Sequence, residues 1–143
     1  MQNPSDTAIH DILSSTRVIA VVGISANVER PSNEVAKFLQ LRGFRVIPVN
    51  PGLAGQKLLG ETVWPDLASI PKDIDVDMVD VFRASEAVPV VVADALAHLP
   101  SLKTIWMQLG VTNESAAAEA RARGVTVVQN RCPKIEWPRV MGR

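Results

Sequence analysis

The feature that most constrains the fold of this chain is a series of short apolar runs rich in β-branched residues. The first run, Val18–Ile24, contains no polar side chain. A run without polar alternation suits a strand that is covered on both faces, as in a parallel sheet. Further runs that predict strands are Phe44–Asn50, Met78–Phe82, Lys103–Leu109 and Val125–Asn130. The sequence therefore predicts a parallel sheet of about five strands.

Segments with helical features separate these runs. Pro31 offers a fixed φ for a helix start, and Gly43 is a suitable stop. Other helices are expected at 5–15, at 89–98 and between Asn113 and Gly124. Residues 51–76 are less regular, with a short strand around 58 and one helical turn at 66–70, and the last strand is the final element expected. Pro48 is awkward inside a ladder and indicates an edge or a strand end.

This alternation predicts the α/β class: a Rossmann-like, doubly wound parallel sheet with helices on both faces. A length of 143 residues corresponds to about one domain. We expect a single domain over residues 1–143, in which residues 1–16 form an N-terminal helical extension.

Charge and cysteine content limit the partners. The 15 basic and 15 acidic residues balance, so the chain lacks the basic excess of proteins that bind nucleic acid or anionic membranes nonspecifically. The single cysteine cannot form an internal disulfide, and the first residues lack the features of a secretory signal. These features predict a cytoplasmic protein whose partner is a small molecule.

The ligand is expected beyond the carboxyl ends of the strands, where open parallel sheets bind their ligands. The loop 23–32 joins the first strand to the first helix, where a phosphate can meet free backbone N–H groups and the positive helix terminus. Arg30 adds a planar cation that can grip a phosphate with two N–H groups. The candidate binding residues are Gly23, Ile24, Ser25, Arg30, Pro31, Ser32, Asn50, Pro51, Phe82, Arg83, Gln108 and Gly110.

The same positions disfavour NAD. The dinucleotide fingerprint G-x-G-x-x-G is not present, because Ser25 stands at the second glycine. Asn50 ends the second strand, where NAD sites carry an acid for the ribose 2′-hydroxyl. A neutral amide and the added Arg30 suit a ligand with more phosphate on its nucleoside.

Six segments in order resemble the small stand-alone coenzyme A-binding domain proteins of bacteria. They are Val21–Ser25, Arg30–Ser32, Pro48–Pro51, Val81–Glu86, Trp106–Glu114 and Arg131–Glu136. Those proteins are similar in fold to the coenzyme A-binding domain of the succinyl-CoA synthetase alpha subunit. The resemblance spans roughly residues 10–136.

The resemblance implies binding of coenzyme A or an acyl-CoA. The resemblance implies phosphate contacts from Gly23, Ser25, Arg30 and Ser32. It also implies that the ribose is bordered by Asn50 and Pro51. Phe82 and Arg83 flank the adenine or its phosphate, while Gln108 and Gly110 line the far side of the cleft. The family resemblance implies no established reaction.

Two classes of function remain open. A non-catalytic carrier, sensor or regulatory protein is favoured, because the strand ends offer no paired acid and base. The alternative is an enzyme, either an NAD(P)-binding oxidoreductase or the coenzyme A-handling half of a split acyl-CoA ligase. No spacing of Cys and His indicates a metal site. Cys132 is either a small apolar filler or, beside Arg131 and Lys134, a thiolate that exchanges with the thiol of coenzyme A.

Overall fold

A parallel sheet of five strands organises the structure, a computed structural model that describes residues 2–142. The strands lie in the order β2-β1-β5-β6-β7. Their bounds are β1 Val18–Val22, β2 Arg45–Val49, β5 Met78–Val81, β6 Thr104–Met107 and β7 Thr126–Val128. A separate antiparallel pair is formed by β3 (Lys57–Leu58) and β4 (Glu61–Thr62). The predicted number of strands in the main sheet and the short strand around residue 58 are confirmed.

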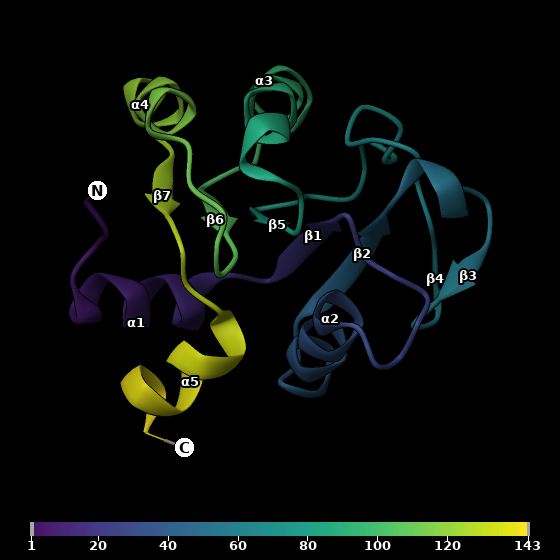
Figure 1. Cartoon of the computed structure of the whole chain (residues 1–143), viewed down its shortest axis with the longest axis horizontal. Coiled ribbons are helices and arrows are strands. Elements are labelled where there is room, and N and C mark those ends of the chain that lie inside the picture. Colours follow the sequence, from purple (N-terminus) through teal and green to yellow (C-terminus); the bar gives the residue numbers. More distant parts are fainter. Residues whose placement is uncertain (1, 143) are drawn as a thin grey trace.

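Helices cover both faces of the sheet (Figure 1). On one face lie α3 (Val88–His98) and α4 (Glu114–Ala122), and on the other lie α1 (Asp6–Ser15), α2 (Pro31–Leu41) and α5 (Pro133–Met141). Two 3₁₀ turns, Pro51–Leu53 and Ser85–Ala87, follow β2 and β5.

Each strand sends alternate side chains to the two faces. Ala20 and Val22 join the apolar core beneath α3 and α4, whereas Ile19 and Val21 join the core beneath α1, α2 and α5. A strand buried on both faces has no polar alternation, which explains the pure apolar runs. The predicted doubly wound fold is confirmed.

The predicted helix starts rest on local chemistry. The Asn113 side-chain oxygen accepts a hydrogen bond from the Ala116 N–H at the start of α4, and Pro31 occupies the first turn of α2. Pro48 lies in β2 at the edge of the main sheet, where its missing N–H is tolerated.

Two expectations were wrong. Residues 66–70 form turns and bends instead of a helical turn, and α5 follows the last strand although no helix was expected there. Pro138 lies inside α5, so local preference opposes that helix and tertiary contacts must hold it.

The contacts of α5 connect it to the rest of its face. The Trp137 ring meets Phe44 edge-on, with 5.9 Å between ring centroids. Arg139 donates to Asp6 of α1 at 2.7 Å and also to Glu136. The hydrogen bond from Arg139 lowers the pKa of the Asp6 carboxyl. These contacts fix α5 beside α1.

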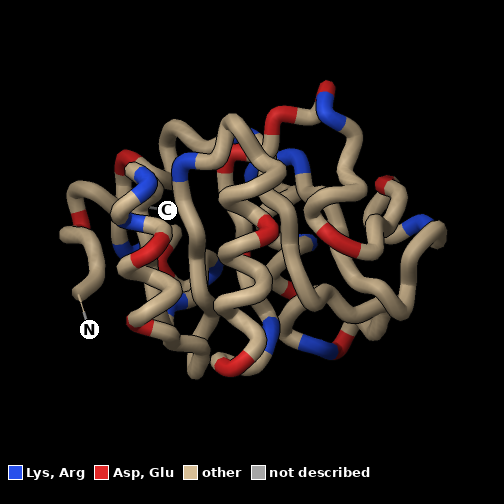
Figure 2. Tube along the Cα trace, turned by 90° about the horizontal axis from the view of Figure 1, so that it is seen from above, with Lys and Arg blue, Asp and Glu red and all other residues tan. Residues whose placement is uncertain are grey.

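Charged residues of both signs are interspersed along the trace (Figure 2). Among the helices within residues 2–142, none has the length and apolar character needed to cross a bilayer.

Candidate ligand-binding cleft

The strand order places a crevice between β1 and β5. From β1 the chain passes through α2 to β2 on one side of the strand, and it later returns as β5 on the other side. α2, which follows β1, and α3, which follows β5, lie on opposite faces of the sheet, which leaves an opening at the carboxyl ends of the two strands. A cleft of about 750 Å³ lies there, within the usual range for small-molecule sites.

Gly23 allows the backbones of β1 and β5 to approach each other at the base of this cleft. Its φ of +90° lies in the region that favours glycine. A Cβ added to Gly23 would lie 2.3 Å from the backbone oxygen of Phe82 and 3.0 Å from Cδ of Arg83. No other residue fits this position without moving the floor of the cleft.

Hydrogen bonds within the loop hold its shape. The Ser32 hydroxyl oxygen accepts from the Ser25 N–H at 2.9 Å, and the Ser25 hydroxyl oxygen accepts from the Asn27 N–H at 3.0 Å. Asn33 donates through Nδ2 to the Ser25 carbonyl at 2.8 Å. Both serine hydroxyls accept, so each keeps its own proton to donate elsewhere.

These hydrogen bonds determine which groups of the loop remain free to contact a phosphate. The Ser25 N–H is taken by Ser32 and is not offered to a ligand. Within the described chain the Ser32 N–H, in the first turn of α2, has no hydrogen-bond partner. The loop therefore offers a ligand the Ser32 N–H at the start of α2 and the two serine hydroxyl groups, whereas the Ser25 N–H is engaged.

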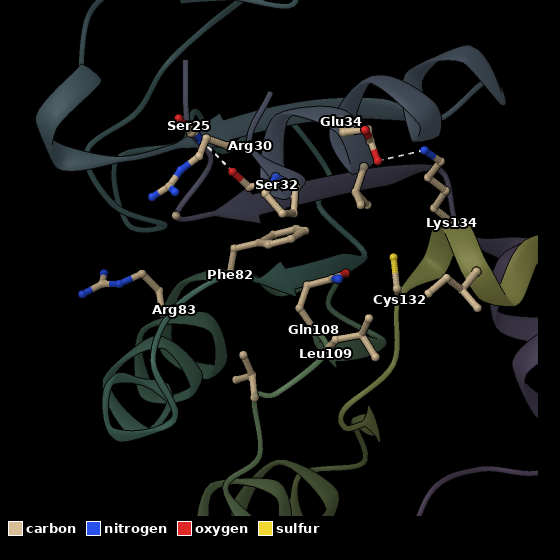
Figure 3. Close-up of a pocket in the computed structure, with 15 residues that line it drawn as sticks. Ser25, Arg30, Ser32, Glu34, Phe82, Arg83, Gln108, Leu109, Cys132 and Lys134 are labelled. Atoms are coloured by element: carbon tan, nitrogen blue, oxygen red, sulfur yellow. Dashed lines mark hydrogen bonds and ion pairs between the residues drawn. The ribbon is translucent and has the colours of Figure 1, made fainter. Parts of the chain in front are cut away.

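Two arginines lie on one side of the cleft and an ion pair on the other (Figure 3). Arg30 and Arg83 are exposed, and neither guanidinium has a hydrogen-bond or ion-pair partner among residues 2–142. On the opposite side Lys134 donates to Glu34 at 2.9 Å, which joins α5 to α2. The arginine side is thus the one with positive charge left for an anion.

The floor contains polar oxygen atoms without partners. Gln108 lines the cleft and is 5% exposed, and its Oε1 accepts no hydrogen bond from any described residue. A buried acceptor without a donor costs about 1–3 kcal/mol, so this oxygen is suited to a donor that a ligand supplies.

Asp80 lies one step below this floor. Asp80 lies in β5 two residues before Phe82, and it pairs in register with Trp106, which lies two residues before Gln108. Since alternate residues of a strand share a face, Asp80 points to the same face of the sheet as Phe82. The side chain is fully buried, and both of its oxygens lack a partner in the described part of the chain. Burial raises the pKa of the Asp80 carboxyl well above its usual range, because no described group compensates the loss of water around the charged form.

Most of the predicted site residues meet in this cleft. Those that line it are Gly23, Ser25, Arg30, Pro31, Ser32, Phe82, Arg83 and Gln108. They come from the ends of β1, β5 and β6 and from the first turn of α2.

The other four predicted residues lie outside the main cleft. Ile24 is fully buried in the core. The Asn50 side chain donates to the Ile24 carbonyl and accepts from the Gly52 N–H, both at 2.8 Å. Gly110 is exposed in a turn, where its N–H donates to the Asn130 side chain.

Pro51, the fourth, lines a smaller cavity of about 120 Å³ on the other side of Gly23. Gly23 and Arg83 line both cavities, so the two adjoin at the end of β1. Asp66 and Asp94 also line the smaller cavity, which gives it two carboxylate acceptors.

Several lining residues were not among the predicted site residues: Glu34, Val35, Leu109, Val111, Cys132, Lys134 and Ile135. Those in α5 were missed because that helix was not expected. Pro133 at its first position and Glu136 in its first turn are the helix-start signal that could have revealed it. Within residues 2–142 no group of three or more His, Cys, Asp or Glu side chains is arranged to hold a metal.

Known proteins share this architecture. A hypothetical protein from Pyrococcus horikoshii OT3 is 31% identical, with a TM-score of 0.89 over 99% of this chain and 98% of that one. The dinucleotide-forming acetyl-coenzyme A synthetase 1 of Ca. Korarchaeum cryptofilum has a TM-score of 0.65 over 82% of this chain and 26% of the synthetase. The two chains are 22% identical in sequence, so this likeness shows only that they share a fold.

Similarity in sequence extends over nearly the whole chain. The uncharacterized protein YneT of Bacillus subtilis (strain 168) is 37% identical over 137 residues, which cover 94% of this chain and 96% of that protein. Residues 17–138 match the family described as CoA binding domain. The resemblance found in the six sequence segments is thus confirmed, and the chain belongs to the CoA-binding domain family.

Proposed function

We propose that this protein binds coenzyme A or an acyl-CoA across the carboxyl ends of β1, β5 and β6, as a non-catalytic carrier, sensor or regulatory protein. The observation that carries the proposal is a pair of guanidinium groups, Arg30 and Arg83, which have no partner among residues 2–142 and lie beside Gly23 at the switch point of the sheet. A pyrophosphate needs cations and close backbone approach at one place, and this is where the chain offers both.

The two adjoining cavities suit the two ends of coenzyme A. The smaller cavity, bordered by Pro51, Arg83 and two carboxylates, would take the adenine, whose amino group is a donor, and would leave the 3′-phosphate on the side of Arg83. The main cleft has an apolar wall of Val35, Phe82, Leu109, Val111 and Ile135, which would contact the pantetheine arm. The pyrophosphate would then lie between them, beside Arg83, which lines both cavities.

A thermal-shift comparison of five ligands tests the proposal. Coenzyme A at about 100 times its dissociation constant should stabilise the protein by about 2.7 kcal/mol. Dephospho-coenzyme A, which lacks the 3′-phosphate, should stabilise the protein less at equal concentration. ADP, which lacks both the 3′-phosphate and the pantetheine arm, should stabilise it less as well. Stabilisation by NAD with none by coenzyme A or acetyl-CoA would overturn the proposal in favour of an oxidoreductase.

Arg30→Ala is expected to weaken coenzyme A binding about 10- to 150-fold, because it removes a charge-assisted hydrogen bond of about 1.5–3 kcal/mol. The Arg30 side chain is exposed and makes no hydrogen bond to another described residue, so the fold should not change. Isothermal titration calorimetry measures the effect. Arg123→Ala, at the far end of α4, is the control and should bind as the wild type does. Equal affinities of the two variants would remove Arg30 from the site.

A further inference from the structure

We propose that Cys132 is a thiol-exchange site, which forms a mixed disulfide with coenzyme A when the disulfide form of that ligand occupies the cleft. This inference rests on the proposed function and adds to it a covalent, redox-dependent state. It starts from the position of the sulfur and from the order of chemical groups along the cleft.

Cys132 is held at the wall of the cleft opposite the arginines. It is 6% exposed and lines the cleft, and in Figure 3 its sulfur points into the space between Gln108 and Lys134. Trp106 donates through Nε1 to the carbonyl of Arg131 at 2.9 Å, which fixes the residue before it. The Cys132 carbonyl accepts from the N–H groups of Ile135 and Glu136 at the start of α5. The sulfur is therefore in a defined place, at the positive end of a helix.

Gln108 provides an independent indication of a ligand beside this sulfur. Its buried Oε1 lacks a donor in the described part of the chain. Figure 3 places Gln108 between the two arginines and Cys132. The pantetheine arm carries two amide N–H groups, either of which could donate to this oxygen and so remove the cost of leaving it unpaired.

The order of groups along the cleft matches the order along coenzyme A. The cleft offers Arg30 and Arg83, then the Gln108 oxygen, then the Cys132 sulfur. Coenzyme A carries phosphates, then amides, then a terminal thiol. With the phosphates beside the arginines, the arm runs toward Cys132. The ion pair of Glu34 with Lys134 borders that end of the cleft.

The reaction is a thiol–disulfide exchange with coenzyme A disulfide as the co-reactant. Cys132 loses its proton, and its sulfur attacks the nearer sulfur of the bound disulfide. A protein–coenzyme A S–S bond forms as the S–S bond of the ligand breaks. The second coenzyme A leaves with both electrons of that bond and takes up the proton. The products are one mixed disulfide and one free coenzyme A thiol.

The experiment is an intact-mass time course under non-reducing conditions. Cys132 is the only cysteine of the chain, so any mixed disulfide reports on this residue alone. Coenzyme A disulfide should add the mass of one coenzyme A less two hydrogens, and the adduct should be lost on addition of dithiothreitol. Glutathione disulfide, which lacks the nucleotide, should react at least about tenfold more slowly, because binding makes the exchange effectively unimolecular.

A competitor and a variant complete the design. Acetyl-CoA, whose sulfur is esterified, should slow the formation of the adduct because it fills the same cleft. The Cys132→Ser variant should form no adduct. If acetyl-CoA stabilises the protein in a thermal shift but coenzyme A disulfide reacts no faster than glutathione disulfide, the exchange site is wrong and the binding function stands. If neither coenzyme A nor acetyl-CoA stabilises the protein, the binding function itself is wrong, and the exchange site with it.

Discussion

Replacing Gly23 with alanine is expected to lower the free energy of unfolding by about 2–5 kcal/mol. An alanine in the left-handed region costs about 1–2 kcal/mol, and overpacking a tight contact adds about 1–3 kcal/mol. Both costs apply, because φ is +90° and the new methyl would lie 2.3 Å from the Phe82 backbone oxygen. Backbone at this distance cannot rotate away as a side chain could, so β1 and β5 would have to separate.

Urea unfolding of Gly23→Ala beside Gly110→Ala measures this effect. Gly110 has a similar φ of +81°, but no atom of residues 2–142 lies within 4 Å of its added Cβ. The control should therefore show the backbone cost alone. Because Arg83 is also within reach of the new methyl, Gly23→Ala should weaken coenzyme A binding as well. Equal losses of stability in the two variants would show that the close approach at Gly23 is not under strain.

Asp80→Asn is expected to flatten the dependence of stability on pH. Burial raises the pKa of Asp80 in the folded protein, so above the ordinary carboxyl range of about 4 the folded state holds a proton that the unfolded chain has lost. The unfolded state then binds fewer protons, and the free energy of unfolding falls as pH rises toward the folded pKa. The slope from this one group is up to about 1.4 kcal/mol per pH unit.

Denaturant unfolding at several pH values between 5 and 8 measures the slope. The asparagine variant should lose this part of the pH dependence and gain stability relative to the wild type as pH rises. Asp73→Asn, in an exposed turn, is the control and should keep the wild-type slope. If Asp80→Asn keeps it too, the buried carboxyl has found a charge partner or water that offsets its burial.

The sheet could be predicted because its signal is local. The absence of polar residues from a run such as Val18–Ile24 indicates by itself that the strand is buried on both faces. Pro31 and Asn113 likewise mark helix starts without reference to distant residues. Alternation of these elements then leaves few topologies. In contrast, α5 contains Pro138 and owes its stability to Phe44 and to Asp6 of α1, which no local pattern reveals.

The site was predicted where strand ends define it and missed where helices complete it. Arg83 and Gln108 follow strands directly, so their place at the rim follows from the topology. Glu34 and Lys134 meet only because α2 packs near α5. Asn50 ends β2 as predicted, and its side chain donates to the Ile24 carbonyl and accepts from the Gly52 N–H, which sequence position does not reveal.

The walls of the cleft come from distant parts of the chain, since one is built by residues 23–35 and the opposite one by residues 132–135. During translation the first wall leaves the ribosome roughly a hundred residues before the second, and the groove between them stays open for that time. Under the proposed function, completion of the binding cleft is therefore a late event in the biogenesis of each molecule, because α5 supplies its second wall.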